Sequence, residues 1–448
     1  MVGTELIERE AHATPSTLLA SLPEVVTAFS FALDAAEGRE AGHAAKLTYV
    51  AMLLAARLEL PADARRTVYY ASLMHDIGVP AAAAGLTGLT GVDEELLFGF
   101  APLNDMDAAE VPIDQRRHAA RVLNDHVTAG AGFLQEPWFP CAGAAAVRHS
   151  HENWDGSGYP LGASGDDILA ASRLIRAGDL FECIVSAETN PLTAWARSRR
   201  TVANWSGHEL QSEIASALLD LVDDDVFWLG FYDDELVTKL VENAADDAVP
   251  SGTLLWEFSR SVADLADAKS GHESGRSQRI ARYVGAMVEG LSMHDEHVAL
   301  LTLLSLWNDV GAFRVPNRIL VKPDLLSLEE MHRMRAHLAF SAEVVERIAV
   351  LCPGARWIAA HHERVDGRGY PEMLSGPAIA SESGILSLAD AYVALTARRP
   401  YREAHSREDA TALLAAGSGS QRDPFLVQMF LELLERERDP GDLRVAGA

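Results

Sequence analysis

Two short stretches decide the fold of this chain: HENWDGSGYP at residues 151–160 and HHERVDGRGYP at residues 361–371. Both contain the pattern His-Glu-x-x-Asp-Gly-x-Gly-Tyr-Pro, which we call the HE motif. The residue before the shared histidine is Ser150 in the first stretch and His361 in the second. Because so specific a pattern occurs twice, the sequence indicates an internal duplication whose two copies have diverged.

Other positions repeat with the same register. The spacing is 233 residues for positions up to Gly78 and 211 residues for positions from His126 onwards. The repeated pairs are His43 with Arg276, HDIG (75–78) with NDVG (308–311), His126 with His337, His151 with His362, Gly158 with Gly369, and Asp179 with Asp390. One insertion of 233 − 211 = 22 residues in the first copy, around AAAAGLTGLTGVDEELLFGFAPLN, explains the change. The sequence therefore predicts two tandem domains, 1–247 and 252–448, joined near the Pro-Ser-Gly of DDAVPSGT.

The segments between these positions have helical spacing of apolar residues. AAKLTYVAMLLAARLEL and ASALLDLV combine this spacing with strong helix formers. Ser406 is expected to cap a helix, with Asp409 three residues later, and Asp423 is expected to cap another that begins at Pro424. Alternating β patterns are sparse. We expect an all-α fold with two tandem helical bundles.

Composition limits the class of protein and of partner. The chain has 448 residues, 48% of them hydrophobic, and no apolar run near the roughly 18–20 residues of a membrane span. Its N-terminus lacks the features of a signal peptide, and its three cysteines (Cys141, Cys183 and Cys352) form no CxxC pair, which favours a cytoplasmic protein without a membrane partner. The net charge of −27 disfavours nucleic acid as a partner but allows a small anionic ligand.

Imidazoles and carboxylates occupy the repeated positions of the first copy: His43, His75, Asp76, His126, His151 and Asp179. Imidazole suits iron, manganese, zinc and cobalt ions, and a carboxylate can bridge two of them. A bridged pair of ions can clamp a phosphodiester oxygen and activate a bound water at neutral pH. A lone His-Asp pair is commonly a capping or surface feature. The ordered set, matched in a second copy, predicts an ancestral metal site.

The order of these motifs resembles the HD-GYP family, a branch of the HD metal-dependent phosphohydrolases. LWNDVG, HHERVDGRGYP and RRPYR extend the resemblance to the second copy. The resemblance implies an all-α fold, two or three metal ions (often iron or manganese), and hydrolysis of cyclic di-GMP to pGpG or GMP. In the arrangement that it implies, Asp76 bridges two ions as the catalytic carboxylate, while His43, His75 and Asp179 hold one ion and His126 and His151 the other.

The first copy departs from the family pattern near the substrate. Ser150 stands at the position of the first histidine of HHE, and His149 is an uncertain substitute because it lies about 100° away around a helix. Val79 stands where the family has a lysine expected to contact phosphate. Arg39 occupies the position of the glutamate that binds a third ion, so we expect at most two ions here. The RPYR phrase is absent from this copy.

The second copy departs on the opposite side of the site. Arg276 and Asn308 replace two histidines, and Ala312 replaces the lysine. An arginine directed into the site would repel cations, so we expect no normal dinuclear centre, at most one weakly held ion, and most simply none. The HE motif of this copy would then be structural, with its glycines and proline setting a tight turn. A composite site across both domains is a further alternative.

These observations predict a metal-dependent phosphodiesterase that acts on a cyclic dinucleotide in the N-terminal copy. The alternative is a catalytically weak or inactive pair of domains that senses a nucleotide or binds a protein. A phosphohydrolase for another small phosphoester is a third reading, because HD proteins act on many phosphoesters. A homodimer or a signalling protein partner is compatible with each reading.

Overall fold

The computed structural model describes residues 18–39, 41–82, 124–136, 139, 142–233, 235, 236, 239, 240, 249–270, 275–398 and 403–438. Within these ranges the chain forms helices and turns, and its β pairing is limited to isolated bridges, which confirms the all-α class. No helix of the described part combines the length and the apolar character that crossing a membrane requires. The predicted insertion, Cys141 and most of RRPYR lie outside the described residues.

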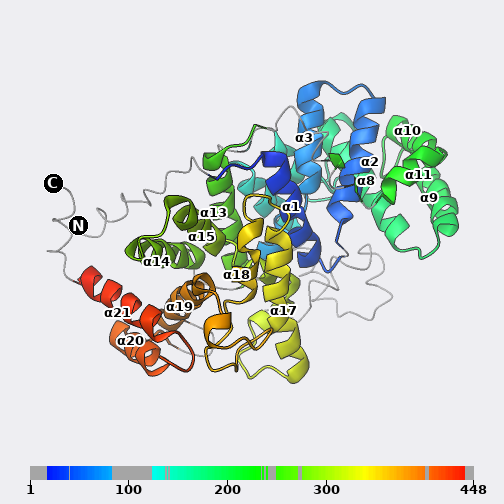
Figure 1. The fold of residues 1–448 in the computed structure, drawn as a ribbon. Coiled ribbons are helices and arrows are strands. Elements are labelled where there is room, and N and C mark those ends of the chain that lie inside the picture. The colour runs from blue at the N-terminus through cyan, green and yellow to red at the C-terminus, as the bar shows by residue number, and fades with distance from the viewer. Residues whose placement is uncertain are drawn as a thin grey trace. The chain divides into compact units, whose positions relative to one another are not determined.

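The helices divide between two compact units, the N-terminal unit and the C-terminal unit (Figure 1). The N-terminal unit contains α1 (Leu22–Ala36), α2 (His43–Arg57), α3 (Ala62–Leu73), α7 (Gly143–Arg148), α8 (Ala170–Ser186), α9 (Pro191–Trp205), α10 (Ser212–Val222) and α11 (Asp225–Phe231). A further helix covers 124–133, and a short 3₁₀ turn covers Gly165–Asp167. Helices α2, α3 and α8 pack against one another and form the centre of this unit.

The C-terminal unit repeats this plan. Its helices are α13 (Gly252–Lys269), α14 (Arg276–Gly290), α15 (Asp295–Ser305), α17 (Leu328–Val345), α18 (Ala355–Ala359), α19 (Ser381–Thr396), α20 (Arg407–Ala416) and α21 (Pro424–Arg438). Short helical segments also cover Val310–Arg314, Cys352–Gly354 and Gly376–Ala378, and the segment Asn317–Leu320 is divided between the two units. Helix α14 packs against α15 and α19, and α17 packs against α18.

The unit boundaries differ in detail from the predicted domains 1–247 and 252–448. Leu18–Ala20 belongs to the C-terminal unit, where the Ser251 N–H donates to the Ala20 carbonyl at 3.0 Å. Ser251 also caps α13, directly after Pro250. Residues 316–318 group with the N-terminal unit. The predicted linker therefore ends where α13 begins.

Matching carboxylates hold the first site helix of each unit. Asp34 on α1 accepts the N–H groups of Gly42 and Ala44 at 2.6 and 3.0 Å, at the start of α2. Asp267 on α13, 233 residues later, accepts the N–H of Ser277 at 3.0 Å, at the start of α14. A carboxylate is favourable there because the first N–H groups of a helix have no partner within it. The duplication thus extends to the hydrogen bonds that orient the helices.

Helix caps follow the sequence where its chemistry is local. The Ser406 hydroxyl accepts the Asp409 N–H at 3.0 Å, and Asp423 accepts the Phe425 N–H at 2.8 Å. Both predicted caps are confirmed.

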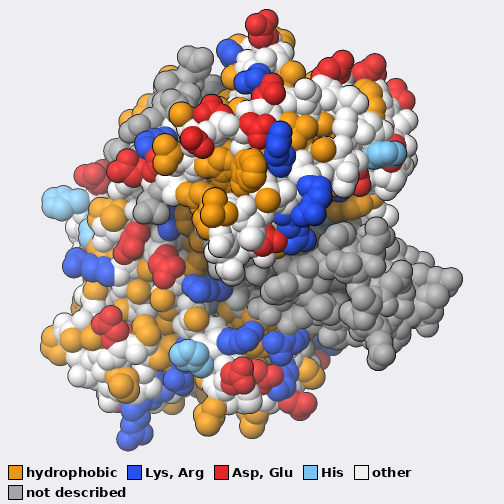
Figure 2. Space-filling model, turned by 90° about the vertical axis from the view of Figure 1, so that its right-hand side faces the viewer, with side chains coloured by type: hydrophobic (Ala, Val, Ile, Leu, Met, Phe, Trp, Pro, Cys, Tyr) orange, Lys and Arg blue, Asp and Glu red, His pale blue; other side chains and the backbone are white. Residues whose placement is uncertain are grey.

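On the face drawn in Figure 2, acidic side chains are interspersed with basic and apolar ones.

Candidate metal centre

The six predicted ligands of the N-terminal unit are buried and come from five segments. His43 is the first residue of α2, and His75 and Asp76 follow the end of α3. His126 lies on the helix 124–133, His151 follows α7, and Asp179 lies on α8. Two groups of mutually close ligand atoms result, one with His43, His75 and Asp76, the other with Asp76, His126 and His151.

Asp76 belongs to both groups. Its Oδ1 lies 3.1 Å from Nε2 of His126 and 3.1 Å from Nε2 of His151. Its Oδ2 lies 3.0 Å from Nε2 of His75. A carboxylate whose two oxygens face different histidines has the geometry of a bridge between two ions. This placement agrees with the bridging role predicted for Asp76.

Asp179 lies on the other side of the same histidines. Its Oδ1 is 4.0 Å from Nε2 of His43, and its Oδ2 is 3.7 Å from Nδ1 of His151. Helix α8 comes this close to α2 because Gly178 has no side chain; a Cβ there would lie 2.7 Å from the Leu47 carbonyl oxygen. The structure therefore brings together all six residues predicted from sequence.

Two histidines present their Nε2 atoms to this centre. His75 donates from Nδ1 to the Ser72 carbonyl at 3.0 Å, and His43 donates from Nδ1 to a Glu182 carboxylate oxygen at 2.5 Å. Among the described residues, the buried Nε2 of His43 has no hydrogen-bond partner, and Nε2 of His75 faces Asp76 Oδ2 at 3.0 Å. Metal-binding histidines commonly have this arrangement, in which a carbonyl or carboxylate fixes the ring from the opposite side. The donor set fits divalent transition-metal ions.

The charges of the site are strongly coupled. Burial opposes ionisation of Asp76, but the charge of His75 and hydrogen bonds from His126 and His151 outweigh it and hold the pKa of Asp76 well below its usual range. Burial also opposes protonation of His75, yet Asp76 raises the pKa of His75 to about 9. Burial lowers the pKa of His151 to about 4. The raised pKa of His75 favours a bound proton, and the lowered pKa of His151 favours the neutral ring that a metal ion needs.

The sequence did not point to three further residues at this centre. Glu37, at the end of α1, is buried, and the burial and the nearby charge of Asp76 raise the pKa of Glu37 well above its usual range. Glu182 holds the His43 ring. Arg176 donates to Asp179 Oδ2 and to Asn153 Oδ1, each at 3.0 Å. Glu182 and Arg176 lie three residues from Asp179 along α8, a helical spacing that could have indicated them.

Arg39 does not stand alone at the position of the missing third-ion ligand. Its Nε lies 3.0 Å from a carboxylate oxygen of Glu37, and it donates to the Cys183 sulfur at 3.2 Å. The acidic group therefore lies six residues before His43, whereas the family pattern places it four residues before. Arg39 lies against this acidic group, which the sequence expectation had not included.

Ser150 can make one of the two interactions that a histidine makes at this position. Its hydroxyl donates to the Val147 carbonyl at 2.8 Å, and the corresponding His361 donates from Nδ1 to the Ile358 carbonyl at 2.7 Å. Ser150 thus keeps the hydrogen bond to the residue three positions back but offers no second nitrogen. His149, the possible substitute, belongs to neither group of ligand atoms in the described part of the chain.

Several other residues of the HE motif build a loop. Glu152 accepts the Leu161 N–H at 2.7 Å, and the corresponding Glu363 accepts the N–H of Glu372 at 2.6 Å. The Tyr159 ring stacks on His151, with centroids 5.0 Å apart. The glutamate fixes the loop and the tyrosine covers a predicted ligand, so the motif positions the histidine.

In the C-terminal unit, Arg276 replaces the corresponding histidine and lies between two carboxylates. Its guanidinium donates to Asp309 Oδ2 at 2.5 Å and also to Asp390. Asn308 is fully buried at the position of His75. His337, His361 and His362 remain close together. The expectation of an arginine directed into this site agrees with the structure, although carboxylates neutralise its charge.

Comparisons with known proteins assign the family. The model of the HD domain family matches residues 115–198 and 260–426, more than half of the chain. The 3'3'-cGAMP-specific phosphodiesterase 3 of Vibrio cholerae is 25% identical over 90% of this chain and 92% of its own length. The cyclic di-GMP phosphodiesterase response regulator RpfG of Xanthomonas campestris is 33% identical over 38% of this chain and 46% of its own.

A solved structure shows the same fold. The crystal structure of the cyclic GMP-AMP-specific phosphodiesterase V-cGAP3 of Vibrio cholerae aligns with a TM-score of 0.66 at 22% identity. The alignment covers 93% of this chain and 98% of that one, so the likeness includes both units. The chain therefore belongs to the HD domain family, with two partly degenerate HD-GYP copies in tandem.

Proposed function

We propose that this protein is a metal-dependent phosphodiesterase that hydrolyses a cyclic dinucleotide in its N-terminal unit. The observation that carries the proposal is the position of the Asp76 carboxylate, with His75 on one oxygen and His126 and His151 on the other. The relatives named above act on cyclic dinucleotides, which supports this substrate class.

The residues present would hold two divalent transition-metal ions, with iron and manganese as the first candidates. Asp76 would bridge them; His43, His75 and Asp179 would hold one, and His126 and His151 the other. When bound, such ions polarise a phosphodiester oxygen and lower the pKa of a bound water. Glu182 holds His43 in the orientation that binding needs, and the Tyr159 ring limits the movement of His151.

Phosphate binding needs another cation because Val79 replaces the lysine of the family and is completely buried. Arg176 can supply it. Its side chain is 16% exposed, and it lies 3.0 Å from Asp179 at the edge of the centre. Its Nε and Nη1 donate to Asn153 and Asp179, so Nη2 is the nitrogen that would donate to a phosphate oxygen. We expect Arg176→Ala to raise KM more than it lowers kcat.

The direct test is hydrolysis of cyclic di-GMP and of 3'3'-cGAMP by the purified chain loaded with Mn²⁺ or Fe²⁺. Asp76→Asn should lower kcat by a factor on the order of 10²–10³ with either substrate, because it removes the bridging charge without changing side-chain size. Asp63→Asn, on the exposed surface of α3, is the matched control and should retain full activity. No turnover of either substrate by the metal-loaded chain would refute the enzymatic proposal.

The second candidate is a sensor that binds a cyclic dinucleotide without hydrolysing it. Ser150 favours it, because its single hydroxyl already donates to the Val147 carbonyl and one ion would lack an imidazole. Calorimetry separates the two functions. A sensor would bind the nucleotide at a fixed number of molecules per chain and leave it uncleaved. Asp76→Asn would then change the affinity of the chain for the nucleotide little.

A further inference from the structure

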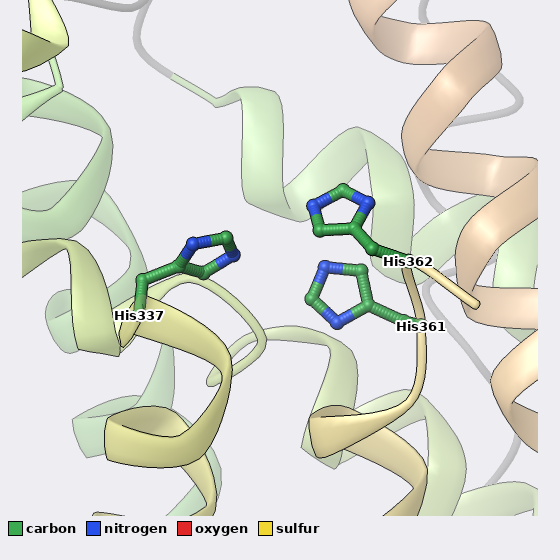
Figure 3. Close-up of side chains that lie close together, drawn as sticks. All are labelled: His337, His361 and His362. Atoms are coloured by element: carbon green, nitrogen blue, oxygen red, sulfur yellow. The ribbon is translucent and has the colours of Figure 1, made fainter. Parts of the chain in front are cut away.

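Three histidines of the C-terminal unit meet at one point. His337 comes from α17, and His361 and His362 directly follow α18. Each offers a ring nitrogen, and these nitrogens lie within 4.8 Å of one another. Figure 3 shows the three rings turned toward a common space. Ligand nitrogens of one tetrahedral ion lie about 3.3 Å apart, so the rings need only a small inward movement to share an ion.

Backbone carbonyls fix two of these rings with their Nε2 atoms directed inward. His337 donates from Nδ1 to the Met334 carbonyl at 2.6 Å, and His361 donates from Nδ1 to the Ile358 carbonyl at 2.7 Å. A carbonyl can only accept, so in the neutral ring the proton is on Nδ1 and the lone pair is on Nε2. Both Nε2 atoms are buried without a hydrogen-bond partner among the described residues. Buried, unpaired acceptors are costly unless a ligand fills the space between them.

The neighbouring carboxylates are divided between this space and Arg276. Asp309 Oδ1 lies 3.8 Å from Nε2 of His337, so it faces the three histidines. Asp309 Oδ2 is held at 2.5 Å by the Arg276 guanidinium. The other arm of the guanidinium binds Asp390. The aspartate that matches Asp76 therefore still has a bridging geometry, with an arginine on one side and histidines on the other.

Arg276 has the position that an ion would have in the N-terminal unit. By the register of the repeat, Arg276, Asp309 and Asp390 match His43, Asp76 and Asp179. The guanidinium is buried, with 5% of the residue exposed, and it supplies a fixed positive charge to two carboxylates. A buried charge is tolerated when it is paired and hydrogen-bonded in this way. A second ion at this position would be excluded by volume and by charge.

We propose that the C-terminal unit binds a single divalent transition-metal ion on His337, His361 and His362, and that the Arg276 guanidinium replaces the second ion. The sequence left open one weakly held ion or, most simply, none, and the geometry of the three histidines favours the single ion. Three imidazoles and one carboxylate oxygen suit zinc, iron or cobalt. The ion would join α17 to the segment after α18, and its role would be to hold the unit together.

The test is the metal content of the full chain after equilibration with Zn²⁺ and removal of free ion, measured by elemental analysis. We expect about three ions in the natural sequence, about two in His361→Ala, and about one in a chain carrying Asp76→Asn and His151→Ala. His332→Ala is the matched control, because His332 is an exposed residue of α17 five positions before His337. It should keep the full count.

The outcomes separate this site from the proposed function. An unchanged count in His361→Ala would overturn the single-ion site, whatever the N-terminal unit does. A different outcome is the loss of one ion in His361→Ala together with an unchanged count in the chain that carries Asp76→Asn and His151→Ala. It would uphold this site and count against the dinuclear centre of the proposed enzyme. Co²⁺ absorption bands in the visible range should weaken in His361→Ala and persist in His332→Ala, which gives a readout independent of the total count.

The replacement by Arg276 has its own test. The double variant Arg276→His with Asn308→His restores the two missing ligands and should raise the count by about one ion per chain. Circular dichroism checks that this double variant is folded. If it is folded but binds no additional ion, the guanidinium does not occupy an ion position.

Discussion

At the scale of single residues, the roles of the HE motif separate clearly. Its histidine lies in the cluster of candidate metal ligands, whereas Glu152 and Glu363 accept backbone N–H groups of the following loop. Ser150 keeps a hydrogen bond but loses a ligand. The difference between the two copies therefore changes the number of nitrogens available to an ion while the loop stays the same.

Glu182 offers a test of how the first ligand is oriented. Its carboxylate lies 2.5 Å from Nδ1 of His43, on the side of the ring away from the centre. Glu182→Gln should weaken Mn²⁺ binding to the N-terminal unit by about 10- to 100-fold, because it removes the charged acceptor behind a ligand. Titration calorimetry measures the change. Glu213→Gln, on the exposed surface of α10, should leave the affinity unaltered; an equal loss there would point to a general effect of charge.

At the scale of elements, a glycine sets the distance between the segment of His75 and Asp76 and the helix of His126. A Cβ on Gly78 would lie 1.8 Å from the His126 carbonyl oxygen, and Gly311 has the same relation to His337, at 1.9 Å. Only glycine permits this approach. The match shows that the helix carrying His126 or His337 is placed by the same backbone contact in both units.

Gly78→Ala tests that contact. The new methyl group must displace the backbone of His126, so we expect the free energy of unfolding to fall by about 1–3 kcal/mol or more. Urea denaturation measures it. Gly132→Ala, in the helix 124–133 that carries His126, is the matched control. A Cβ on Gly132 would meet no atom within 4 Å, so the free energy of unfolding should stay the same or rise by about 0.5–1 kcal/mol. Equal stability of both variants would contradict the close approach.

The sequence predicted the helical class, and it predicted the motif residues that the structure brings together as candidate ligands. Repeat register and helical periodicity predicted the all-α fold, and capping chemistry predicted the helix starts after Ser406 and Asp423, because these interactions are local. Glu37 escaped because it lies six residues before His43 and reaches Asp76 only through the packing of α1. The salt bridges of Arg276 depend on Asp309 and Asp390, 33 and 114 residues away, which local patterns do not report.

At the scale of the whole molecule, each unit concentrates buried ionisable groups around one centre. Such groups are costly in a helical core unless ions or salt bridges compensate them. The N-terminal unit has Asp76, Asp179 and Glu37 near its histidines, whereas the C-terminal unit has Arg276 among its carboxylates. Ion binding should therefore contribute to the stability of the fold as well as to chemistry.

Removal of metal should lower the thermal stability of the chain. An ion present at 100 times its dissociation constant stabilises the folded state by about 2.7 kcal/mol, provided that it does not bind the unfolded chain. We expect the melting temperature in excess EDTA to fall by several degrees and to recover on addition of Mn²⁺ or Zn²⁺. Scanning calorimetry measures both. A melting curve identical with and without EDTA would show that neither centre binds an ion in the folded state.

The salt bridges of Arg276 give the two units different dependence on their surroundings. A bound ion can be withheld by starvation, exchanged for another ion or changed by oxidation, but an arginine is present whenever the chain has been synthesised. The paired carboxylates of the C-terminal unit therefore keep a permanent buried charge between them when metal is scarce, whereas Asp76 of the N-terminal unit has histidines beside it. Under such scarcity one half of the chain would keep much of its internal order, and the other half would respond to the supply of metal in the cell.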